Sequence, residues 1–576
     1  MEDYRVRYEQ WLNDPVIDEE TKAELRSIAA DEMEIKERFF KELEFGTGGL
    51  RGIIGNGSNR LNQYTVGKAS QGLANYIKKE GTQDKGVAIA YDSRFMSPEF
   101  AEVAGLIFAA NGIPAYVYPS LRPVPMLSFA VRELGCTAGV VLTASHNPPE
   151  YNGYKVYWAD GAQVVAPRDK GIITEVNAVS DFGQILRMDR KEAEEKKLFN
   201  IIGEEVDEAY DKNVQASLMN PEMIARMGDK LNIVYTPLHG SGNMPVRRNL
   251  EKAGFKNVFI VKEQEMPDSK FSTVEYPNPE DTKVFVMAQE LAAKVDADVL
   301  IGTDPDADRV GAMVKDDKGE FVALTGNHVG ALATEYILSQ KKEQGKLPAN
   351  GAVIKTIVST EMITPICEAY GVEKMDVLTG FKFIGEKIKG FEETGSHEYL
   401  YGFEESYGCL GGTYARDKDA VYASVLICEM AAYYKEKGMT LYEALLALYE
   451  KYGYFREGVK SLTMKGLEGM ERIQLIMKTF RENTPAELGG YKVVVAKDYK
   501  TQVFKDLVTG AESASPLPVS DVLHYTLEEG TWVCIRPSGT EPKLKFYIGV
   551  KADSLQAAQD KVDALNADID AKIAAI

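Results

Sequence analysis

The sequence is poor in cysteine: its 576 residues include five, Cys136, Cys367, Cys409, Cys428 and Cys534, and no two form a CxxC pair. A sparse, odd set of this kind is typical of reduced thiols and not of a disulfide framework. Apolar runs are also short, since none approaches the roughly 18 residues of a membrane-spanning helix. The acidic start, Met1-Glu2-Asp3, lacks the apolar segment of a secretory signal. These absences predict a cytoplasmic protein that does not enter the membrane.

Positive charge is scarce as well, because 67 lysines and arginines stand against 87 aspartates and glutamates, giving a net charge of −20. This balance argues against nucleic acid and anionic membranes as partners. A small anionic ligand would instead need local cations. The apolar share of 44% and the charged share of 27% are those of an ordinary soluble protein. A chain of this length is too long for one core and predicts roughly three to five domains.

A serine stands in the polar turn Thr143-Ala144-Ser145-His146-Asn147-Pro148, directly after the apolar run at 138–142. The run predicts a short buried strand. Ser145 would therefore lie at the carboxyl end of a strand, where open α/β sheets bind their ligands. A serine beside a potential base, here His146, is the setting of a covalent nucleophile. Taken alone, the same six residues also fit a plain polar turn.

Three aspartates alternate in the segment Gly302-Thr303-Asp304-Pro305-Asp306-Ala307-Asp308-Arg309, near a second apolar run at 297–301. Hard divalent cations prefer oxygen ligands, so these carboxylates predict a metal site, with Mg²⁺ favoured and room left for a phosphate oxygen. A calcium EF-hand is excluded because Arg309 replaces the glycine at the sixth loop position and Lys315 the glutamate at the twelfth. The alternative is a solvated acidic turn, in which the three unpaired carboxylates would repel one another.

Two further loops carry groups that suit a sugar phosphate. Arg536-Pro537-Ser538-Gly539-Thr540-Glu541-Pro542-Lys543 lies between apolar runs. It offers a bidentate guanidinium, two hydroxyls and a glycine that lets backbone N–H groups approach an anion, although an ordinary hairpin turn also fits. Gly402-Phe403-Glu404-Glu405-Ser406-Tyr407-Gly408 places adjacent glutamates in a loop bracketed by glycines. They would accept hydrogen bonds from sugar hydroxyls or, in the alternative, from water.

In their order along the chain, these four segments resemble the functional loops of the α-D-phosphohexomutase superfamily, most closely its phosphoglucomutase/phosphopentomutase branch. The likeness runs from Phe45 to the C-terminus. The metal loop departs from the family pattern at Pro305, and the sugar loop at Phe403 and Tyr407. Further segments agree with the family: Gly46-Thr47-Gly48-Gly49-Leu50-Arg51-Gly52, Tyr91-Asp92-Ser93-Arg94, Asn152-Gly153-Tyr154-Lys155, Thr379-Gly380-Phe381-Lys382 and Arg416-Asp417-Lys418-Asp419.

The fold class that we expect is α/β, because strand and helix signals alternate and restart at 232–237 and at 351–358, whereas the last segment contains strand pairs and a helix after Ser554. This pattern predicts three similar mixed or parallel α/β domains and a C-terminal α+β domain, which the resemblance places around a central cleft. The expected divisions are an N-terminal helical extension (1–45), domain one with the serine loop (46–215), domain two with the metal loop (216–320), domain three with the sugar loop (321–453) and domain four with the phosphate loop (454–576).

The resemblance implies that Ser145 is carried as a phosphoserine and that its phosphate completes the metal site of Asp304, Asp306 and Asp308. Lys155 is the first candidate for general base and His146 the second. A lysine base needs a lowered pKa, which the neighbouring charge of Arg51 would supply, and Lys155 could alternatively be a phosphate-binding cation. Arg51 is assigned to charge stabilisation. The implied substrate-binding residues are Thr379, Gly380, Lys382, Glu404, Ser406, Lys418, Arg536, Ser538, Gly539 and Thr540.

The implied reaction interconverts glucose 1-phosphate and glucose 6-phosphate through a glucose 1,6-bisphosphate intermediate, with Mg²⁺ as cofactor. Phosphopentomutase, phosphomannomutase and sugar-bisphosphate synthase activities are the rivals within the enzyme class. A non-catalytic protein that binds sugar phosphates is the rival from a different class, but a binder needs no phosphorylatable serine. The expected partners are small sugar phosphates, and the chain is expected to be a monomer or a weak homodimer.

Overall fold

The computed structural model describes residues 3–46, 48–464, 466–538 and 543–576. Contacts within the chain divide it into two compact units. The first comprises Met1–Leu324, Gly385–Gly395 and Ser406–Thr440, and the second comprises Thr325–Ile384, Ser396–Glu405 and Leu441–Ile576. Each unit is described by itself.

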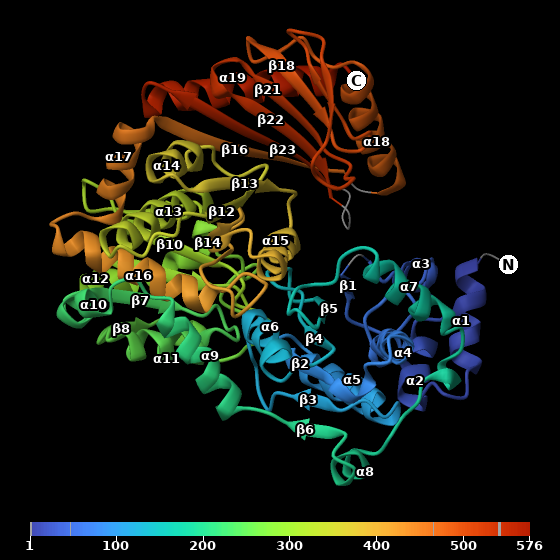
Figure 1. The fold of residues 1–576 in the computed structure, drawn as a ribbon. Helices are drawn as coiled ribbons and strands as arrows, with labels where there is room; N and C mark the ends of the chain where they lie inside the picture. The colour runs from blue at the N-terminus through green and yellow to red at the C-terminus, as the bar shows by residue number, and fades with distance from the viewer. Residues whose placement is uncertain (1–2, 47, 465, 539–542) are drawn as a thin grey trace. The chain divides into compact units, whose positions relative to one another are not determined.

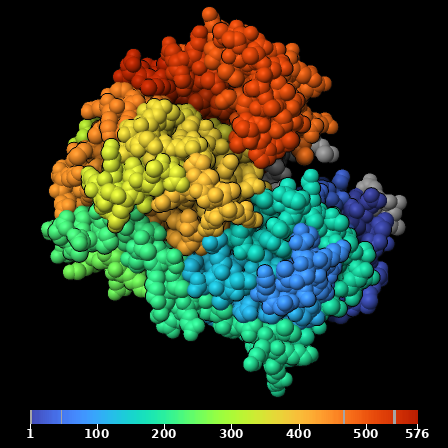
Figure 2. Space-filling view, viewed as in Figure 1, coloured from blue at the N-terminus to red at the C-terminus, as the bar shows by residue number. Residues whose placement is uncertain are grey.

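The N-terminal residues form three short helices, α1 (Asp3–Asn13), α2 (Glu19–Ser27) and α3 (Glu32–Phe39). Aspartates cap the second and third helices, where Asp18 and Asp31 accept hydrogen bonds from backbone N–H groups. Aromatic rings hold the helices on the first domain, since Trp11 meets both Phe39 and Tyr64 in edge-to-face contacts. In the space-filling view, the dark blue N-terminal residues lie directly against teal residues of the same unit (Figure 2). Residues 3–39 thus form three short helices that pack on the sheet-bearing part of the same unit.

The first sheet has the strand order β1-β5-β4-β2-β3-β6. Its strands β2, β3, β4 and β6 are parallel, whereas β5 runs antiparallel to both β1 and β4. The strands are β1 (Gly49–Ile53), β2 (Val87–Tyr91), β3 (Ala115–Val117), β4 (Ala138–Leu142), β5 (Tyr151–Trp158) and β6 (Phe199–Ile201). The helices around this sheet and leading to the next are α4 (Gln63–Lys79), α5 (Ser97–Ala110), α6 (Val124–Glu133), α7 (Arg168–Ala178), α8 (Arg190–Glu195) and α9 (Glu204–Ala216).

The second sheet has the order β11-β10-β9-β7-β8, with β8, β7 and β9 parallel and the other pairs antiparallel. Its strands are β7 (Asn232–Thr236), β8 (Asn257–Ile260), β9 (Val299–Thr303), β10 (Val310–Lys315) and β11 (Phe321–Leu324), with helices α10 (Pro221–Met227), α11 (Asn243–Ala253) and α12 (Val286–Val295). Because β4 and β9 are fully buried, the polar segments that follow them lie at the ends of rigid strands. This arrangement positions the serine and aspartate loops.

In the next segment, the strands β13, β12 and β14 lie side by side in that order and are parallel. These are β12 (Gly351–Thr356), β13 (Glu373–Val377) and β14 (Glu398–Phe403), accompanied by α13 (Gly326–Glu343), α14 (Ile363–Tyr370), α15 (Phe381–Thr394) and α17 (Leu441–Tyr452). The part of α15 from Gly385 onward belongs instead to the first unit, as do the intervening β15 (Cys409–Leu410) and α16 (Ala420–Glu436). In that unit, α16 packs on α10 and α11.

The last segment forms an antiparallel sheet in the order β16-β23-β22-β21-β18-β19-β20, with β17 paired to β18. Helices α18 (Gly466–Glu482) and α19 (Leu555–Ala574) pack against it (Figure 1). Ser554 caps α19, which buries Ala558, Val562, Leu565 and Ile569 as one stripe. The strands are β16 (Tyr454–Thr463), β17 (Glu487–Leu488), β18 (Tyr491–Asp498), β19 (Val503–Asp506), β20 (Glu512–Ala514), β21 (Leu523–Leu527), β22 (Trp532–Pro537) and β23 (Lys543–Ala552).

The predicted fold class is confirmed: three α/β sheets are followed by an α+β segment. The exact domain boundaries and the central cleft stay predictions. Within the described ranges, no helix is both long and apolar enough to span a membrane.

Candidate active site

Ser145 lies in a constrained turn at the carboxyl end of β4. Its backbone φ is 53°, a left-handed conformation that few non-glycine residues adopt. The backbone N–H of Ser145 donates to Oγ1 of Thr143 over 2.8 Å, and the residue is only 2% exposed. A non-glycine residue in this region persists where its surroundings hold it in place. The turn is therefore a fixed structure and not a mobile polar loop.

Arg94, from the turn after β2, holds that structure. Its guanidinium donates to the carbonyl oxygens of Ser145 (2.5 Å), Pro148 (2.8 Å) and Tyr151 (2.9 Å) and to that of Asn147. Arg94 is 1% exposed, and its charge is balanced by Asp92, whose Oδ2 lies 3.4 Å from Nε. The same carboxylate accepts a hydrogen bond from Thr143 Oγ1 (2.6 Å). One buried ion pair thus fixes both ends of the serine turn.

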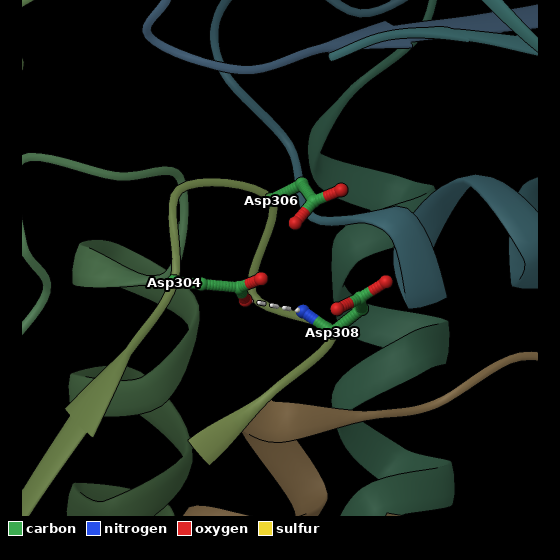
Figure 3. A group of neighbouring side chains, drawn as sticks. All are labelled: Asp304, Asp306 and Asp308. Atoms are coloured by element: carbon green, nitrogen blue, oxygen red, sulfur yellow. Dashed lines mark hydrogen bonds between the residues drawn. The ribbon is translucent and has the colours of Figure 1, made fainter. Parts of the chain in front are cut away.

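The three aspartates of the metal loop converge between β9 and β10 (Figure 3). They are buried, and one ligand atom from each lies within 4.8 Å of the others. Oδ1 of Asp304 accepts the N–H groups of Asp308 (3.1 Å) and Arg309 (3.0 Å), which curls the loop around that carboxylate. Among the residues that the structure describes, Oδ1 of Asp306 has no hydrogen-bond partner although it is buried. A buried oxygen without a partner is costly unless a ligand satisfies it.

Ser145 and the metal loop meet directly. Oγ of Ser145 donates to Oδ2 of Asp304 (2.8 Å) and accepts from Nη1 of Arg309 (2.6 Å). The same Nη1 lies 3.2 Å from Asp304 Oδ2 and 2.9 Å from Asp308 Oδ1. Arg309 was not among the predicted site residues, although it directly follows the last aspartate of the loop. Its place next to a candidate metal loop was the signal that sequence reasoning missed.

Two lysines complete the charge balance of the metal loop. Nζ of Lys155, on β5, donates to Oδ2 of Asp306 (2.9 Å) and lies 3.9 Å from Asp308. Nζ of Lys418 lies 3.1 Å from Oδ2 of Asp308. Together with Arg309, these lysines give each of the three carboxylates at least one cationic partner. Both lysines were predicted site residues, and the structure places both at the metal loop.

The surrounding charges perturb the aspartates in opposite directions. Burial, reinforced by the charges of Asp306 and Asp308, raises the pKa of Asp304 well above its usual range. Burial also opposes ionisation of Asp308, but the cations Arg309, Lys418 and Lys155 outweigh it and hold the pKa of Asp308 far below its usual value. The surroundings therefore disfavour the ionised form of Asp304 and favour that of Asp308. A divalent cation would stabilise the ionised form of Asp304, so this donor set fits a metal ion.

His146 lies beside the serine, with Nδ1 3.4 Å from Ser145 Oγ. Burial and the charges of Arg309 and Arg51 hold the pKa of His146 well below its usual value. The imidazole is therefore neutral near pH 7. Arg51 lies on β1, where its backbone is paired with Gly153 of β5, and its side chain is exposed. The structure thus brings all four predicted catalytic residues into the neighbourhood of the serine loop.

In the second unit, two adjacent glutamates of the predicted sugar loop make separate contacts. Oε1 of Glu404 accepts the backbone N–H of Gly380 (3.0 Å), whose φ is 122°. Oε2 of Glu405 accepts a hydrogen bond from Oγ1 of Thr356 (2.9 Å), at the end of β12. Oγ1 of Thr379 is buried and has no hydrogen-bond partner in the described part of the chain. The backbone of Gly380 thus meets Glu404, and the predicted residues Thr379 and Lys382 lie in the same segment as Gly380.

The predicted phosphate loop also lies in the second unit, between β22 and β23. Arg536 is paired with Lys545 of β23, and the N–H of Ser538 donates to the carbonyl of Lys543 (2.8 Å). Both residues are partly exposed at the end of the strand pair. The predicted residues Gly539 and Thr540 lie outside the described residues. Ser406 belongs to the first unit with Lys418, so the predicted substrate-binding residues are distributed over both units.

Family models match four consecutive parts of the chain, between residues 42 and 567. The models of phosphoglucomutase/phosphomannomutase alpha/beta/alpha domains I, II and III match residues 42–182, 208–319 and 325–452. The model of the C-terminal domain of the same family matches residues 482–567. These ranges contain the four loops in the predicted order.

Curated relatives match over nearly their full length. A phosphoglucomutase from Staphylococcus aureus (strain MRSA252) is 37% identical over 536 residues, which cover 93% of this chain and 94% of the relative. A phosphoglucomutase from Staphylococcus epidermidis is 37% identical over 522 residues, which cover 90% and 93% of the two chains.

Solved structures share the fold at lower identity. A putative phosphomannomutase from Thermus thermophilus superposes with a TM-score of 0.68 at 22% identity, covering 92% of this chain and 99% of the other. The open form of parafusin, a phosphoglucomutase from Paramecium, gives a TM-score of 0.67 at 18% identity, covering 92% and 94%. At these identities, the structural likeness concerns the fold.

Proposed function

The chain belongs to the phosphoglucomutase/phosphomannomutase family, and we propose that it interconverts glucose 1-phosphate and glucose 6-phosphate through a phosphorylated Ser145. Its relatives identify the protein as a mutase, which is an intramolecular phosphotransferase of the isomerase class. The observation that carries the proposed mechanism is the hydroxyl of Ser145, held between Arg309 and Asp304.

Ser145 supplies the oxygen that accepts and returns the phosphoryl group. Its hydroxyl is bonded on one side to a carboxylate of the metal loop and on the other to a guanidinium. Arg309 would therefore lie against the phosphoryl oxygens of phosphoserine, where its fixed donors stabilise developing negative charge. Arg94 and Thr143 keep the serine turn in one conformation, so the reacting oxygen needs no reorientation between the two half-reactions.

Asp304, Asp306 and Asp308 would hold a divalent cation, for which we propose Mg²⁺, with a phosphoserine oxygen as a further ligand. Bound there, the cation would polarise the phosphoryl group and neutralise its charge during transfer. The N-acetylphosphoglucosamine mutase from Aspergillus fumigatus, which superposes with a TM-score of 0.50 at 14% identity, was solved with GlcNAc-6P and magnesium. That complex supports the choice of cation.

The attacking sugar hydroxyl must lose a proton, and we propose Lys155 as the first candidate acceptor and His146 as the second. Lys155 is paired with Asp306. His146 is neutral and 3.4 Å from Ser145 Oγ, so it can accept a proton without prior deprotonation. Arg51 would stabilise charge, because guanidinium is too basic to serve as a base.

The remaining predicted residues would bind the sugar phosphate. Glu404 and Ser406 suit the sugar hydroxyls, and Lys418 and Lys382 suit phosphate oxygens. The phosphate that is not reacting would be bound by Arg536, Ser538, Gly539 and Thr540. After glucose 1,6-bisphosphate reorients, this is the other of its two phosphates. We further propose a cytoplasmic monomer or weak homodimer. The five cysteines are buried free thiols, as suits a reducing compartment.

Initial rates on glucose 1-phosphate, mannose 1-phosphate and ribose 1-phosphate, measured side by side, test the substrate. The expected order places glucose first, because the curated relatives that match over nearly their full length are phosphoglucomutases. A higher kcat/KM for ribose 1-phosphate would overturn the glucose assignment and leave the phosphoserine mechanism intact. Intact-protein mass, with and without phosphatase treatment, tests the phosphoserine separately, since removal of one phosphate lowers the mass by a fixed amount.

A further inference from the structure

The loop before α16 carries four charged residues in a row, Arg416-Asp417-Lys418-Asp419, and three of them are anchored within the first unit. The backbone N–H of Arg416 donates to Ser128 Oγ over 2.8 Å. Asp419 accepts hydrogen bonds from the hydroxyls of Tyr210 and Tyr414, each over 2.7 Å to its Oδ2. Asp417 accepts a hydrogen bond from the hydroxyl of Tyr157 over 2.6 Å. The loop therefore has little freedom at either side of Lys418.

Tyr157 connects this loop to the strand that carries Lys155. Residues two apart on a strand point to the same face, so Lys155 and Tyr157 extend from β5 toward the same side. Tyr157 is completely buried. Burial and the charge of Asp417 raise the pKa of Tyr157 well above its usual value, so the hydroxyl keeps its proton and acts as a donor.

The carboxylate of Asp417 has three contacts, one of which is the backbone N–H of Lys418, which donates to Oδ1 over 2.8 Å. Its Oδ2 accepts from Tyr157, while its Oδ1 lies 3.0 Å from Nζ of Lys418. That Nζ also lies 3.1 Å from Oδ2 of Asp308 in the metal loop. Asp417 is 5% exposed and Lys418 is 8% exposed, so water contributes little to holding either side chain. An unbroken set of polar contacts thus runs from Tyr157 through Asp417 and Lys418 to Asp308.

The stem of Lys418 is confined as well. A Cβ atom added to Gly408 would lie 2.1 Å from Cδ of Lys418, which shows that the lysine stem packs directly on the glycine backbone. The ammonium therefore reaches the metal loop along one route. Among the contacts described, the ammonium meets the carboxylates of Asp308 and Asp417, and the Asp417 carboxylate is held by Tyr157 at Oδ2 and by the backbone N–H of Lys418 at Oδ1.

We propose that Tyr157 is a positioning residue that, through Asp417, fixes the ammonium of Lys418 at the metal loop, where it meets a phosphate of the substrate. The inference rests on the proposed function for the role of Lys418 but concerns different residues. Without the hydroxyl of Tyr157, Oδ2 of Asp417 loses its donor, the carboxylate is held at Oδ1 alone, and the ammonium is placed less firmly. In the hydrogen bonds described above, Tyr157 donates to Asp417 and to neither the serine nor the metal loop, so we expect its effect on catalysis to pass mainly through Lys418.

A double-mutant cycle tests this coupling, because residues that act through one another show non-additive effects. The variants are Tyr157→Phe, Lys418→Met and the combination of both, assayed with glucose 1-phosphate. Loss of a hydrogen bond to a charged group predicts a decrease in kcat/KM of about tenfold to a hundredfold for Tyr157→Phe. In the Lys418→Met background, the same change should decrease kcat/KM less than twofold. Multiplicative effects of the two substitutions would overturn the proposal.

Tyr154→Phe is the matched control. Tyr154 lies on the same strand, three residues away and hence on the opposite face, and it is also completely buried. Its hydroxyl is bonded to Ser70 over 3.1 Å, far from Lys418 in the contact network. Tyr154→Phe should change kcat/KM less than twofold and should combine additively with Lys418→Met. An equal loss of activity in both tyrosine variants would show a merely structural effect and would refute the positioning role.

A second readout does not depend on the reaction. Brief labelling with acetic anhydride, followed by peptide mass spectrometry, reports the reactivity of Lys418. We expect faster labelling of Lys418 in Tyr157→Phe than in the wild type or in Tyr154→Phe, and equal rates would overturn the inference. If Tyr157→Phe does not fold, Asp417→Asn replaces it in both experiments. A wild-type protein inactive on glucose 1-phosphate would refute the proposed function, and the labelling result would still decide the positioning role.

Discussion

Arg309 and Ser145 are separated by 164 positions in the sequence, yet Nη1 of Arg309 donates a hydrogen bond to Oγ of Ser145 over 2.6 Å. The same nitrogen lies within 3.2 Å of carboxylate oxygens of Asp304 and Asp308. One guanidinium therefore joins the serine loop to the metal loop. Burial favours the neutral form of Arg309, but the charges of Asp308 and Asp304 outweigh it and raise its pKa further, so it is cationic at every accessible pH.

Replacing Arg309 by lysine should reduce kcat/KM by roughly a hundredfold while the charge is kept, because one ammonium cannot reproduce the planar donor set that spans the serine and two aspartates. The assay is the conversion of glucose 1-phosphate at saturating Mg²⁺. Arg247→Lys is a suitable control, since Arg247 forms an ion pair with Glu265 and has no contact with the serine loop in the described contacts. Similar losses in both variants would remove Arg309 from the site.

Ser145→Ala should abolish turnover and leave the fold in place. The side chain loses the oxygen that carries the phosphoryl group, whereas removal of one hydroxyl changes the free energy of unfolding by only about 1 kcal/mol. Turnover and the melting temperature check the two statements separately. Ser70→Ala, which also removes a buried hydroxyl, should stay active. Mutase rates near those of the wild type in Ser145→Ala would end the phosphoserine mechanism.

Chelation of divalent cations should stop catalysis, and added Mg²⁺ should restore it. Asp306→Asn should weaken binding of Mg²⁺ in calorimetric titrations, because it removes a charged ligand while keeping the shape of the side chain. In the wild type, Oδ1 of Asp306 is buried without a partner in the described residues, so it is available to a cation. Unchanged affinity in Asp306→Asn, or full activity after chelation, would contradict the metal assignment.

Arg536→Ala should raise the KM for glucose 1-phosphate by about tenfold to several hundredfold and should change kcat less. The guanidinium can make two charge-assisted hydrogen bonds to a phosphate that does not react, and such uniform binding contributes mainly to KM. Arg481→Ala in the same unit is a control, because Arg481 is paired with Asp498 and Asp521. An unchanged KM in Arg536→Ala would exclude the loop from substrate binding.

Glu457, on β16, should make the protein less stable as the pH rises toward neutrality. Burial raises the pKa of Glu457 to about 7, despite the opposing hydrogen bond from Thr360 and the charge of Lys355. In the unfolded chain a glutamate titrates near pH 4.3, roughly. Because the folded pKa is the higher one, the stabilisation is complete below about pH 4.3 and is lost as the pH rises through about 7.

Glu457→Gln removes this titration and should therefore exceed the wild type in stability by about 1–3 kcal/mol at pH 8, with a smaller difference at pH 5. Thermal melting at the two pH values measures the change. Glu471→Gln, at an exposed position of α18, is the matched control and should melt like the wild type at both pH values. A constant difference between Glu457→Gln and the wild type across this range would contradict the raised pKa.

The sequence allowed the serine and metal loops to be predicted because apolar runs identify buried strands, and polar groups directly after such strands are positioned by them. Ser145 follows β4, and Asp304 follows β9, as the pattern indicated. The fold class could be predicted for the same reason, since alternating strand and helix signals are local properties of the chain. The roles of the individual site residues stay predictions.

The contacts between loops could not be predicted, because no local pattern encodes them. Lys418 reaches Asp308 from a loop whose anchors, Tyr157 and Ser128, are far away in the chain. Tyr157 was not singled out either, because the tyrosines of this segment, Tyr151, Tyr154 and Tyr157, indicate no more than core residues. Tyr154 is such a core residue, with its hydroxyl bonded to Ser70, whereas the hydroxyl of Tyr157 donates a hydrogen bond to the carboxylate of Asp417.

Arg94 gives the serine turn a fixed length. One guanidinium accommodates the carbonyl oxygens of four residues between Ser145 and Tyr151, and each occupies a definite place around it. An inserted or deleted residue would move several of these oxygens out of reach at once, and each buried carbonyl left without a donor would cost about 1–3 kcal/mol. Side chains along this segment can therefore be changed while Arg94 stays. A change in the number of residues requires that Arg94 be replaced first.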